Sequence, residues 1–181
     1  MVRKILETME KVIFLDVDGP LIPSPLYFLS ILVSQDRSYF STVAVAFVNK
    51  LCMQTGAKIV FNSTHNSHEH FDEFEGKWRS LKMDAIRHGI RPEYIHEDWK
   101  TGYPNIVPED KFYAPTHERM RAIQHWQTVN GQVDWIAFDD EPFTKDSRLI
   151  VVDFDRGIDY DSYKMAAAEF GVSDAMKGLI L

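Results

Sequence analysis

Residues 11–20, Lys-Val-Ile-Phe-Leu-Asp-Val-Asp-Gly-Pro, constrain the fold more than any other stretch of the chain. Val12–Leu15 form a continuous apolar run, which is the pattern of a strand buried on both faces. Asp16 and Asp18 follow at once, and a Gly-Pro pair then ends the strand. Residues i and i+2 of a strand point to the same side, so two carboxylates come together at the end of a buried strand. Because such burial is costly unless a cation or a proton compensates it, the stretch predicts a functional site.

Strands and helices alternate along the rest of the chain. Apolar runs predict strands at 58–62, 94–96, 134–138 and 149–152, and amphipathic spacing predicts helices at 41–55, 71–89, 116–130 and 159–170. This alternation favours a mainly parallel sheet with helices on both faces, an α/β fold. At 181 residues we expect a single domain spanning residues 1–181. Within it, residues 21–40 form either a small flap or cap insert over the site or a surface turn whose aromatic side chains pack into the core.

Two further predicted strands also end in polar residues. Ser63 and Thr64 follow the strand at 58–62, and Asp139 and Asp140 follow the strand at 134–138. Ligands of parallel sheets bind outside the carboxyl ends of the strands, so these side chains are expected at one edge together with Asp16. Four carboxylates at one edge form a hard-oxygen site suited to Mg²⁺, which usually also takes an oxygen from a substrate phosphate.

Such a site has the groups needed for phosphoryl transfer. An ionised Asp close to a phosphate can attack it, and a second carboxylic acid, its pKa raised by like-charged neighbours, can protonate the departing oxygen and then activate water. A cation from the helix before the strand at 134–138 would stabilise the extra negative charge.

Composition narrows the function classes. The formal net charge of −7 argues against nucleic-acid binding by the whole surface and leaves a local basic groove open. Cys52 is the only cysteine, which excludes an internal disulfide and a thiolate-rich metal site. The N-terminus lacks a signal-peptide core, and the longest apolar-looking run, 26–33, is too short to span a bilayer. We therefore expect a cytoplasmic protein without a membrane partner.

Asp-Val-Asp-Gly at 16–19, Ser63 after a second strand and the Asp pair at 139–140 resemble the haloacid dehalogenase (HAD) superfamily over roughly residues 11–152. The resemblance implies a Rossmann-like three-layer sandwich and a Mg²⁺-dependent phosphatase that forms an aspartyl-phosphate. The acid at position 18 favours phosphoryl transfer over dehalogenation, because a halide leaves without a proton.

The resemblance also implies roles for individual residues. Asp16 would be the nucleophile, Asp18 the general acid and base, and Arg119 the stabilising cation, with His117, Arg121 and Lys111 as rivals to Arg119. The implied Mg²⁺ ligands are Asp16, the Asp18 carbonyl, and Asp139 or Asp140 or both. The substrate contacts that we assign are Ser63, Thr64, His65 and Gly19.

Two departures from the family pattern concern access to the site. Pro20 follows Gly19 where the family more often has an apolar residue, so the flap geometry is expected to differ. The stretch between Ser63 and Arg119 is too short for the larger family cap, which implies little or no cap and an open site. The layout also resembles small capless members associated with nucleic-acid end repair and phage-type nucleotide phosphatases. The expected substrate is a phosphorylated small molecule, a nucleotide or a nucleic-acid end, and the sequence does not define an oligomeric state.

Other interpretations stay open for several of these residues. Ser63 and Thr64 are also suited to capping the following helix. The histidines at 65, 68 and 70 suggest zinc, but a fourth ligand is not apparent. The basic residues between 77 and 91 fit either a nucleic-acid path or a solvated helix face. The rival to an enzyme is a non-catalytic regulatory module that keeps the phosphate and metal site.

Overall fold

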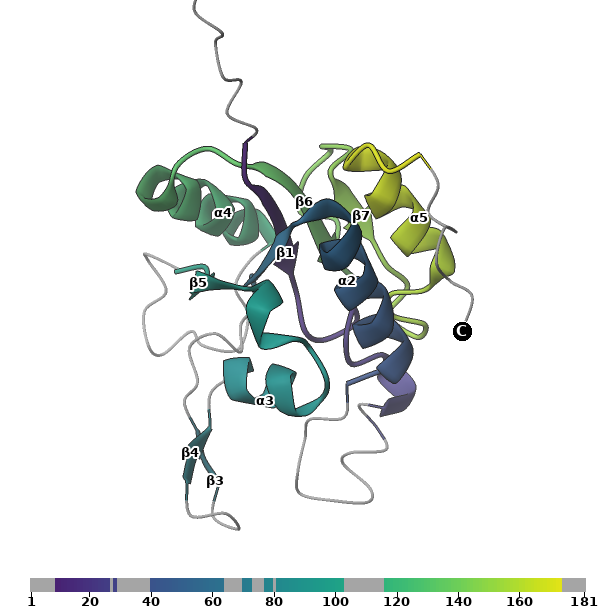
Figure 1. Cartoon of the computed structure of the whole chain (residues 1–181). Coiled ribbons are helices and arrows are strands. Elements are labelled where there is room, and N and C mark those ends of the chain that lie inside the picture. The colour runs from purple at the N-terminus through teal and green to yellow at the C-terminus, as the bar shows by residue number, and fades with distance from the viewer. Residues whose placement is uncertain are drawn as a thin grey trace, which may run out of the picture.

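Figure 1 shows the computed structural model of the chain, which describes residues 9–26, 28, 40–63, 70–72, 77–79, 81–102 and 116–173, with the backbone alone at 70–72, 77–79, 116 and 117. Its main sheet has the order β5-β2-β1-β6-β7, and all four pairings are parallel. The strands are β1 (Lys11–Leu15), β2 (Lys58–Phe61), β5 (Ile95–Lys100), β6 (Asp134–Asp139) and β7 (Leu149–Val151). The helices around them are α2 (Thr42–Thr55), α3 (Leu81–Arg87), α4 (Thr116–Asn130) and α5 (Tyr160–Glu169). The prediction of a parallel α/β sandwich is confirmed.

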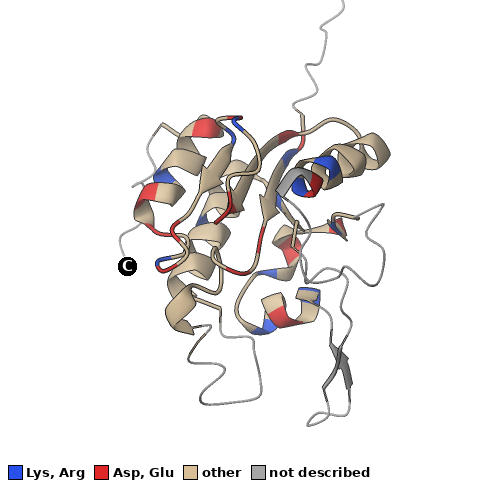
Figure 2. Cartoon of the chain, turned by 180° about the vertical axis from the view of Figure 1, so that it is seen from behind, with Lys and Arg blue, Asp and Glu red and all other residues tan. Residues whose placement is uncertain are grey.

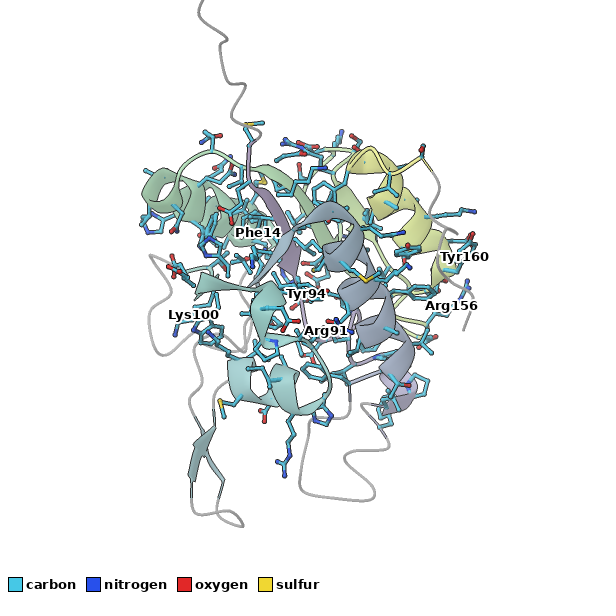
Figure 3. The ribbon with its side chains drawn as sticks, viewed as in Figure 1. Phe14, Arg91, Tyr94, Lys100, Arg156 and Tyr160 are labelled. Atoms are coloured by element: carbon cyan, nitrogen blue, oxygen red, sulfur yellow. The ribbon has the colours of Figure 1, made fainter. Side chains whose placement is uncertain are left out.

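The side chains of β1 divide the core into two layers. Ile13 and Leu15 pack in a cluster with buried residues of α2, α3 and α5. Val12 and Phe14 point to the other face, where the cluster includes Ile123 and Trp126 of α4. The Phe14 ring lies 5.5 Å from that of Trp126 in an edge-to-face contact, and Figure 3 shows it on the α4 side of the sheet. This alternation means that even-numbered positions of β1 face α4.

The helix ends follow the local signals in the sequence. Ser41 caps α2 by accepting a hydrogen bond from the Ala44 amide, and Gly56 ends the helix with φ at 74°. Asp159 begins α5 with a capping box that it shares with Ser162. Among the described residues, no helix is both apolar enough and long enough to cross a lipid bilayer.

The prediction of one helix over residues 71–89 is wrong. The structure has an antiparallel hairpin, β3 (His70–Asp72) and β4 (Lys77–Arg79), followed by the short helix α3. Aromatic residues at spacings of three and four suggested the longer helix, but two of them also sit in polar–aromatic–polar triplets that suit strands. Gly76 between these triplets further disfavours a helix, by about 1 kcal/mol relative to Ala. The predicted third strand exists and is longer than expected, since β5 runs on to Lys100.

The loop after β1 is held by the segment that follows β7. Residues 21 and 22 both donate backbone hydrogen bonds to the Val17 carbonyl, which makes a tight turn. The Pro20 carbonyl accepts from the Ile158 amide at 3.0 Å, and the Leu21 carbonyl accepts from the Ser41 amide at 2.7 Å. The segment after β7 and the residue that precedes α2 therefore both fix the position of the loop that carries the carboxylates of Asp16 and Asp18. Of the flap expected at 21–40, residues 27 and 29–39 lie outside the described part.

Replacing Gly157 by alanine is expected to destabilise the protein more than the same change at Gly56. Both glycines adopt the left-handed backbone conformation, with φ at 66° and 74°. An alanine in this conformation lowers the free energy of unfolding by roughly 1–2 kcal/mol. A Cβ at Gly157 would also lie 2.9 Å from the Pro20 carbonyl oxygen, whereas one at Gly56 would have no neighbour within 4 Å. Urea unfolding of the two variants tests this, with an extra loss of roughly 1–3 kcal/mol expected for Gly157→Ala. Equal losses would contradict the close approach of the two loops.

Candidate active site

The sheet register places two carboxylates side by side. Leu15 pairs with Phe138 across β1 and β6, and the Asp16 amide donates to the Phe138 carbonyl at 3.0 Å. Asp16 and Asp139 are thus neighbours at the carboxyl ends of adjacent strands. Along each strand, every second residue faces α4, and Asp16 and Asp139 continue that alternation. Both side chains therefore lie on the α4 face of the sheet. Both are almost fully buried, with 2% and 1% of their surface exposed.

Arg119 bridges these two carboxylates from the first turn of α4. One guanidinium nitrogen, Nη1, lies 2.6 Å from Asp16 Oδ2 and 2.5 Å from Asp139 Oδ2. Arg119 precedes the core residue Ile123 by four positions, so it shares the helix face that packs on the sheet. Of the rivals named from the sequence, Arg121 pairs with Glu118 and its side chain is 62% exposed. The side chain of residue 117 and all of residue 111 lie outside the described part.

Asp140 completes an acidic cluster through close packing against the first loop. Asp16, Asp139 and Asp140 each offer a carboxylate oxygen, and these oxygens lie within 4.8 Å of one another. A Cβ on Gly19 would come within 2.6 Å of the Asp140 Cβ, so a glycine at this position, with φ at 78°, is what allows the approach. The Gly19 amide donates to the Ile22 carbonyl at 3.1 Å. Asp18 lies in the same turn, half-buried and bridged to Ile22.

The polar residues after β2 also reach this edge. The Asn62 amide donates to the Leu15 carbonyl at 2.9 Å, which holds the end of β2 against β1. Ser63 is fully buried, and its side chain makes a hydrogen bond with the Asp16 carboxylate. The predicted substrate contacts Thr64 and His65 lie outside the described residues, as does the histidine at 68. The structure therefore brings Ser63 to the acidic cluster with Asp16.

One pair of buried polar residues at this edge was missed from the sequence. Thr101 Oγ1 donates to Asn62 Oδ1 at 2.8 Å, and the Thr101 amide donates to the Phe61 carbonyl at 2.9 Å. Both side chains are buried, and they lie beside Ser63 at the carboxyl ends of β5 and β2. A polar residue directly after a strand was the available signal, but the prediction ended β5 at residue 96, five positions too early for Thr101 to stand out.

Burial and mutual repulsion raise the pKa values of the acidic cluster. Burial raises the pKa of Asp16 above its usual range even though the Arg119 guanidinium acts in the opposite direction. Burial, followed by the charge of Asp16, raises the pKa of Asp139 to about 8. The same two causes raise the pKa of Asp140 to about 6. One guanidinium therefore does not compensate two buried carboxylates and the half-buried carboxylate of Asp140.

This donor set fits Mg²⁺. The three carboxylate oxygens are hard ligands close enough to share one ion, and Mg²⁺ bound through carboxylates usually keeps water and takes an oxygen from a substrate phosphate as further ligands. A divalent cation would also supply the positive charge that the raised pKa values show to be lacking. The residues that would hold it are Asp16, Asp139 and Asp140.

Comparison with known families assigns most of the chain. A family model described as "HAD domain in Swiss Army Knife RNA repair proteins" matches residues 12–162. The match begins within β1 and ends in α5, so it includes Asp16, Ser63, Arg119 and the acid pair at 139–140. No curated protein and no solved structure matches the chain.

Mg²⁺ is expected to raise the melting temperature of the wild-type protein and to have little effect on Asp139→Asn. The substitution removes one of three converging ligands, and ligand binding stabilises only a protein that holds it. Without Mg²⁺ and above pH 8, where Asp139 is ionised, the variant should melt at or above the wild-type temperature, because one buried like charge is gone. Asp161→Asn, on a side chain 75% exposed in α5, is the matched control and should keep the full shift. A normal Mg²⁺ shift in Asp139→Asn would exclude the proposed ligand set.

The Mg²⁺ shift should also weaken as the pH falls from about 8 to about 6, the pKa values of Asp139 and Asp140 in the metal-free protein. Protons compete with the cation for these oxygens, so binding releases protons and strengthens with rising pH. Thermal melts at fixed Mg²⁺ across this range measure the effect, with the metal-free protein melted at each pH as the reference. A shift that stays constant from pH 8 down to pH 6 would show that the carboxyls are already ionised without metal.

Proposed function

Because the chain belongs to the HAD domains of Swiss Army Knife RNA repair proteins, we propose that it is a Mg²⁺-dependent phosphomonoesterase that acts on the phosphorylated end of a nucleic-acid strand. The observation that carries the proposal is the buried cluster in which Arg119 bridges Asp16 and Asp139. The family supports a phosphatase-type hydrolase, and the words "RNA repair" in its description support a nucleic-acid end as substrate.

In the proposed reaction Asp16 is the nucleophile. A carboxylate oxygen of Asp16 attacks phosphorus, the bond between phosphorus and the ester oxygen breaks, and an aspartyl-phosphate forms. Asp18 donates a proton to the departing oxygen, which leaves as the hydroxyl of the strand end. Asp18 then takes a proton from a water molecule as that water attacks phosphorus, which releases inorganic phosphate and restores Asp16. Its place in the turn after β1, less buried than Asp16, suits a residue that exchanges protons with solvent.

The neighbouring groups stabilise charge during this sequence. Arg119 holds Asp16 in position and would donate to a phosphoryl oxygen as negative charge builds up. The Ser63 side chain, which is hydrogen-bonded to Asp16 and follows β2, is the proposed phosphate ligand. When bound, Mg²⁺ would neutralise the acidic cluster and polarise a phosphate oxygen. The Thr101–Asn62 hydrogen bond fixes the backbone that carries Ser63.

Asp16→Asn and Asp18→Asn are expected to fail at different steps. Asp16→Asn should lose at least about a thousandfold in kcat on p-nitrophenyl phosphate and on phosphorylated oligonucleotides, because the nucleophile is gone. Asp18→Asn should lose about 10²–10⁴-fold in steady-state rate. Since p-nitrophenolate leaves without a proton, Asp18→Asn should still release a stoichiometric burst of it and accumulate the phosphoenzyme.

Rapid-quench assays, in which the phosphoenzyme is trapped with acid and then quantified, measure both outcomes. Asp153→Asn, an exposed acid beyond β7, serves as the control and should retain the wild-type rate. Undiminished turnover in Asp16→Asn, or absence of Mg²⁺-dependent phosphate release by the wild type, would refute the proposal. Binding of Mg²⁺ and phosphate mimics without turnover would instead support the regulatory module.

Arg119→Met should lower kcat on p-nitrophenyl phosphate by about 10²–10³-fold, and Arg119→Lys should lower it less. Methionine keeps much of the buried volume but removes the donor to Asp16 and to the phosphoryl group, whereas lysine restores one charge. Steady-state kinetics at saturating Mg²⁺ measure the effect, and circular dichroism checks the fold. Arg121→Met, two positions along α4 and exposed, is the matched control. A methionine variant as active as the control would show that Arg119 has only a structural role.

A further inference from the structure

We propose that the outer face of α3 and the loop after it, formed by Lys82, Arg87 and Arg91, binds the single-stranded RNA whose phosphorylated end enters the acidic cluster. This inference rests on the proposed function and adds the path of the substrate strand. A mononucleotide would not need such a surface. An RNA substrate would, because every nucleotide beyond the terminal phosphate adds a negative charge.

The distribution of charge along the chain leaves few places for a polyanion. The protein carries a net charge of −7, which repels RNA at long range. Residues 134–161, from β6 into α5, include nine acidic and three basic residues, whereas residues 77–91 include five basic residues and one acidic residue. Figure 2 shows basic positions and one acidic position on α3, and several acidic positions in the loops toward the β7 edge of the sheet and on α5. The basic stretch runs from β4 through α3 to Arg91.

The packing of α3 turns its basic residues outward. Its buried positions are Leu81, Asp84 and Ala85, so the acidic residue of this stretch lies on the inner side. Lys82 is half-buried and Arg87 is exposed, and both occupy the remaining, outer part of the helix surface. The stretch therefore presents positive charge to solvent while its one carboxyl is turned into the protein.

The loop after α3 is held firmly enough to present Arg91. Asn49 of α2 donates to the Gly89 carbonyl at 2.8 Å and accepts from the Arg91 amide at 3.1 Å. The Arg91 guanidinium lies 5.9 Å from the centre of the Tyr94 ring, and Figure 3 shows these two side chains next to each other. Arg91 is exposed. A guanidinium over an aromatic ring keeps donors available for phosphate oxygens.

A short series of contacts connects α3 to the candidate active site. The His88 ring stacks on Phe40, with ring centres 5.1 Å apart. The next residue, Ser41, donates its amide to the Leu21 carbonyl in the loop that follows Asp16. Figure 1 shows α3 beyond the carboxyl end of β1, the end at which Asp16 lies. A strand that left the acidic cluster toward α3 would meet the basic residues, whereas one that left toward the other edge of the sheet would meet the acidic β7–α5 segment.

The test uses two triple variants with the same change in charge. Lys82→Gln, Arg87→Gln and Arg91→Gln together remove the proposed surface and keep the side-chain stems. Lys145→Gln, Arg156→Gln and Lys164→Gln together form the control, at exposed positions near β7 and α5. Hydrolysis of p-nitrophenyl phosphate and of a short phosphorylated oligoribonucleotide is measured over a salt series. Binding of the same RNA is followed by fluorescence anisotropy in EDTA, which tests the surface without turnover.

For the α3 variant we expect weaker RNA binding and a lower kcat/KM on RNA, with p-nitrophenyl phosphate hydrolysis unchanged. The slope of log Kd against log salt should fall by about 2, because each lost contact with a single strand contributes about 0.7. The control variant should keep the wild-type slope. An unchanged slope in the α3 variant, or equal changes in both variants, overturns the inference. Loss of p-nitrophenyl phosphate hydrolysis by the wild type would instead overturn the proposed function, and the binding arm would still decide the surface.

Discussion

The contact of one buried guanidinium with two carboxylates is the interaction on which the candidate site depends. Arg119 lies between Asp16 and Asp139, which occupy neighbouring positions of two paired strands. Unit charges 4 Å apart interact by about 4 kcal/mol at the effective dielectric of a protein, so adjacent buried carboxylates would be strongly destabilising alone. With Asp140 added, the cluster still has an excess of negative charge, and its raised pKa values follow from that excess. The donor set is therefore one that a further cation would neutralise.

The alternation of side chains along β1 separates the chemistry from the main core. One face of the sheet packs on α2, α3 and α5 and holds the larger cluster of buried apolar side chains. The other face packs on α4. The acidic cluster lies at the carboxyl ends of the strands on this same face, because Asp16 and Asp139 continue the alternation of the residues that face α4. The same helix thus contributes packing through Ile123 and charge through Arg119, one turn apart. Loops from β1 and β7 meet at Gly157 and keep the first acidic loop in place.

The uneven distribution of charge bears on the proposed nucleic-acid substrate. The acidic residues that prepare the site for a cation also make much of its surroundings repel a polyanion. The basic stretch on α3 lies at the same end of the sheet and is connected to the first loop through Phe40 and Leu21. A phosphatase of nucleic-acid ends needs both features, since the terminal phosphate and the strand behind it are bound by different means.

The sequence alone predicted the parallel α/β sandwich, the ends of α2 and α5, and the candidate residues Asp16, Ser63, Arg119, Asp139 and Asp140, because apolar runs, caps and polar strand ends are local signals. Only the tertiary structure decided that residues 70–72 pair with residues 77–79 as antiparallel strands, since two periodicities fitted the same aromatic residues. It also showed that Arg119, and not Arg121, contacts the carboxylates, and it revealed the Thr101–Asn62 pair. These outcomes depend on the rotation of α4 and on the pairing of strands distant in sequence, which a linear pattern does not contain.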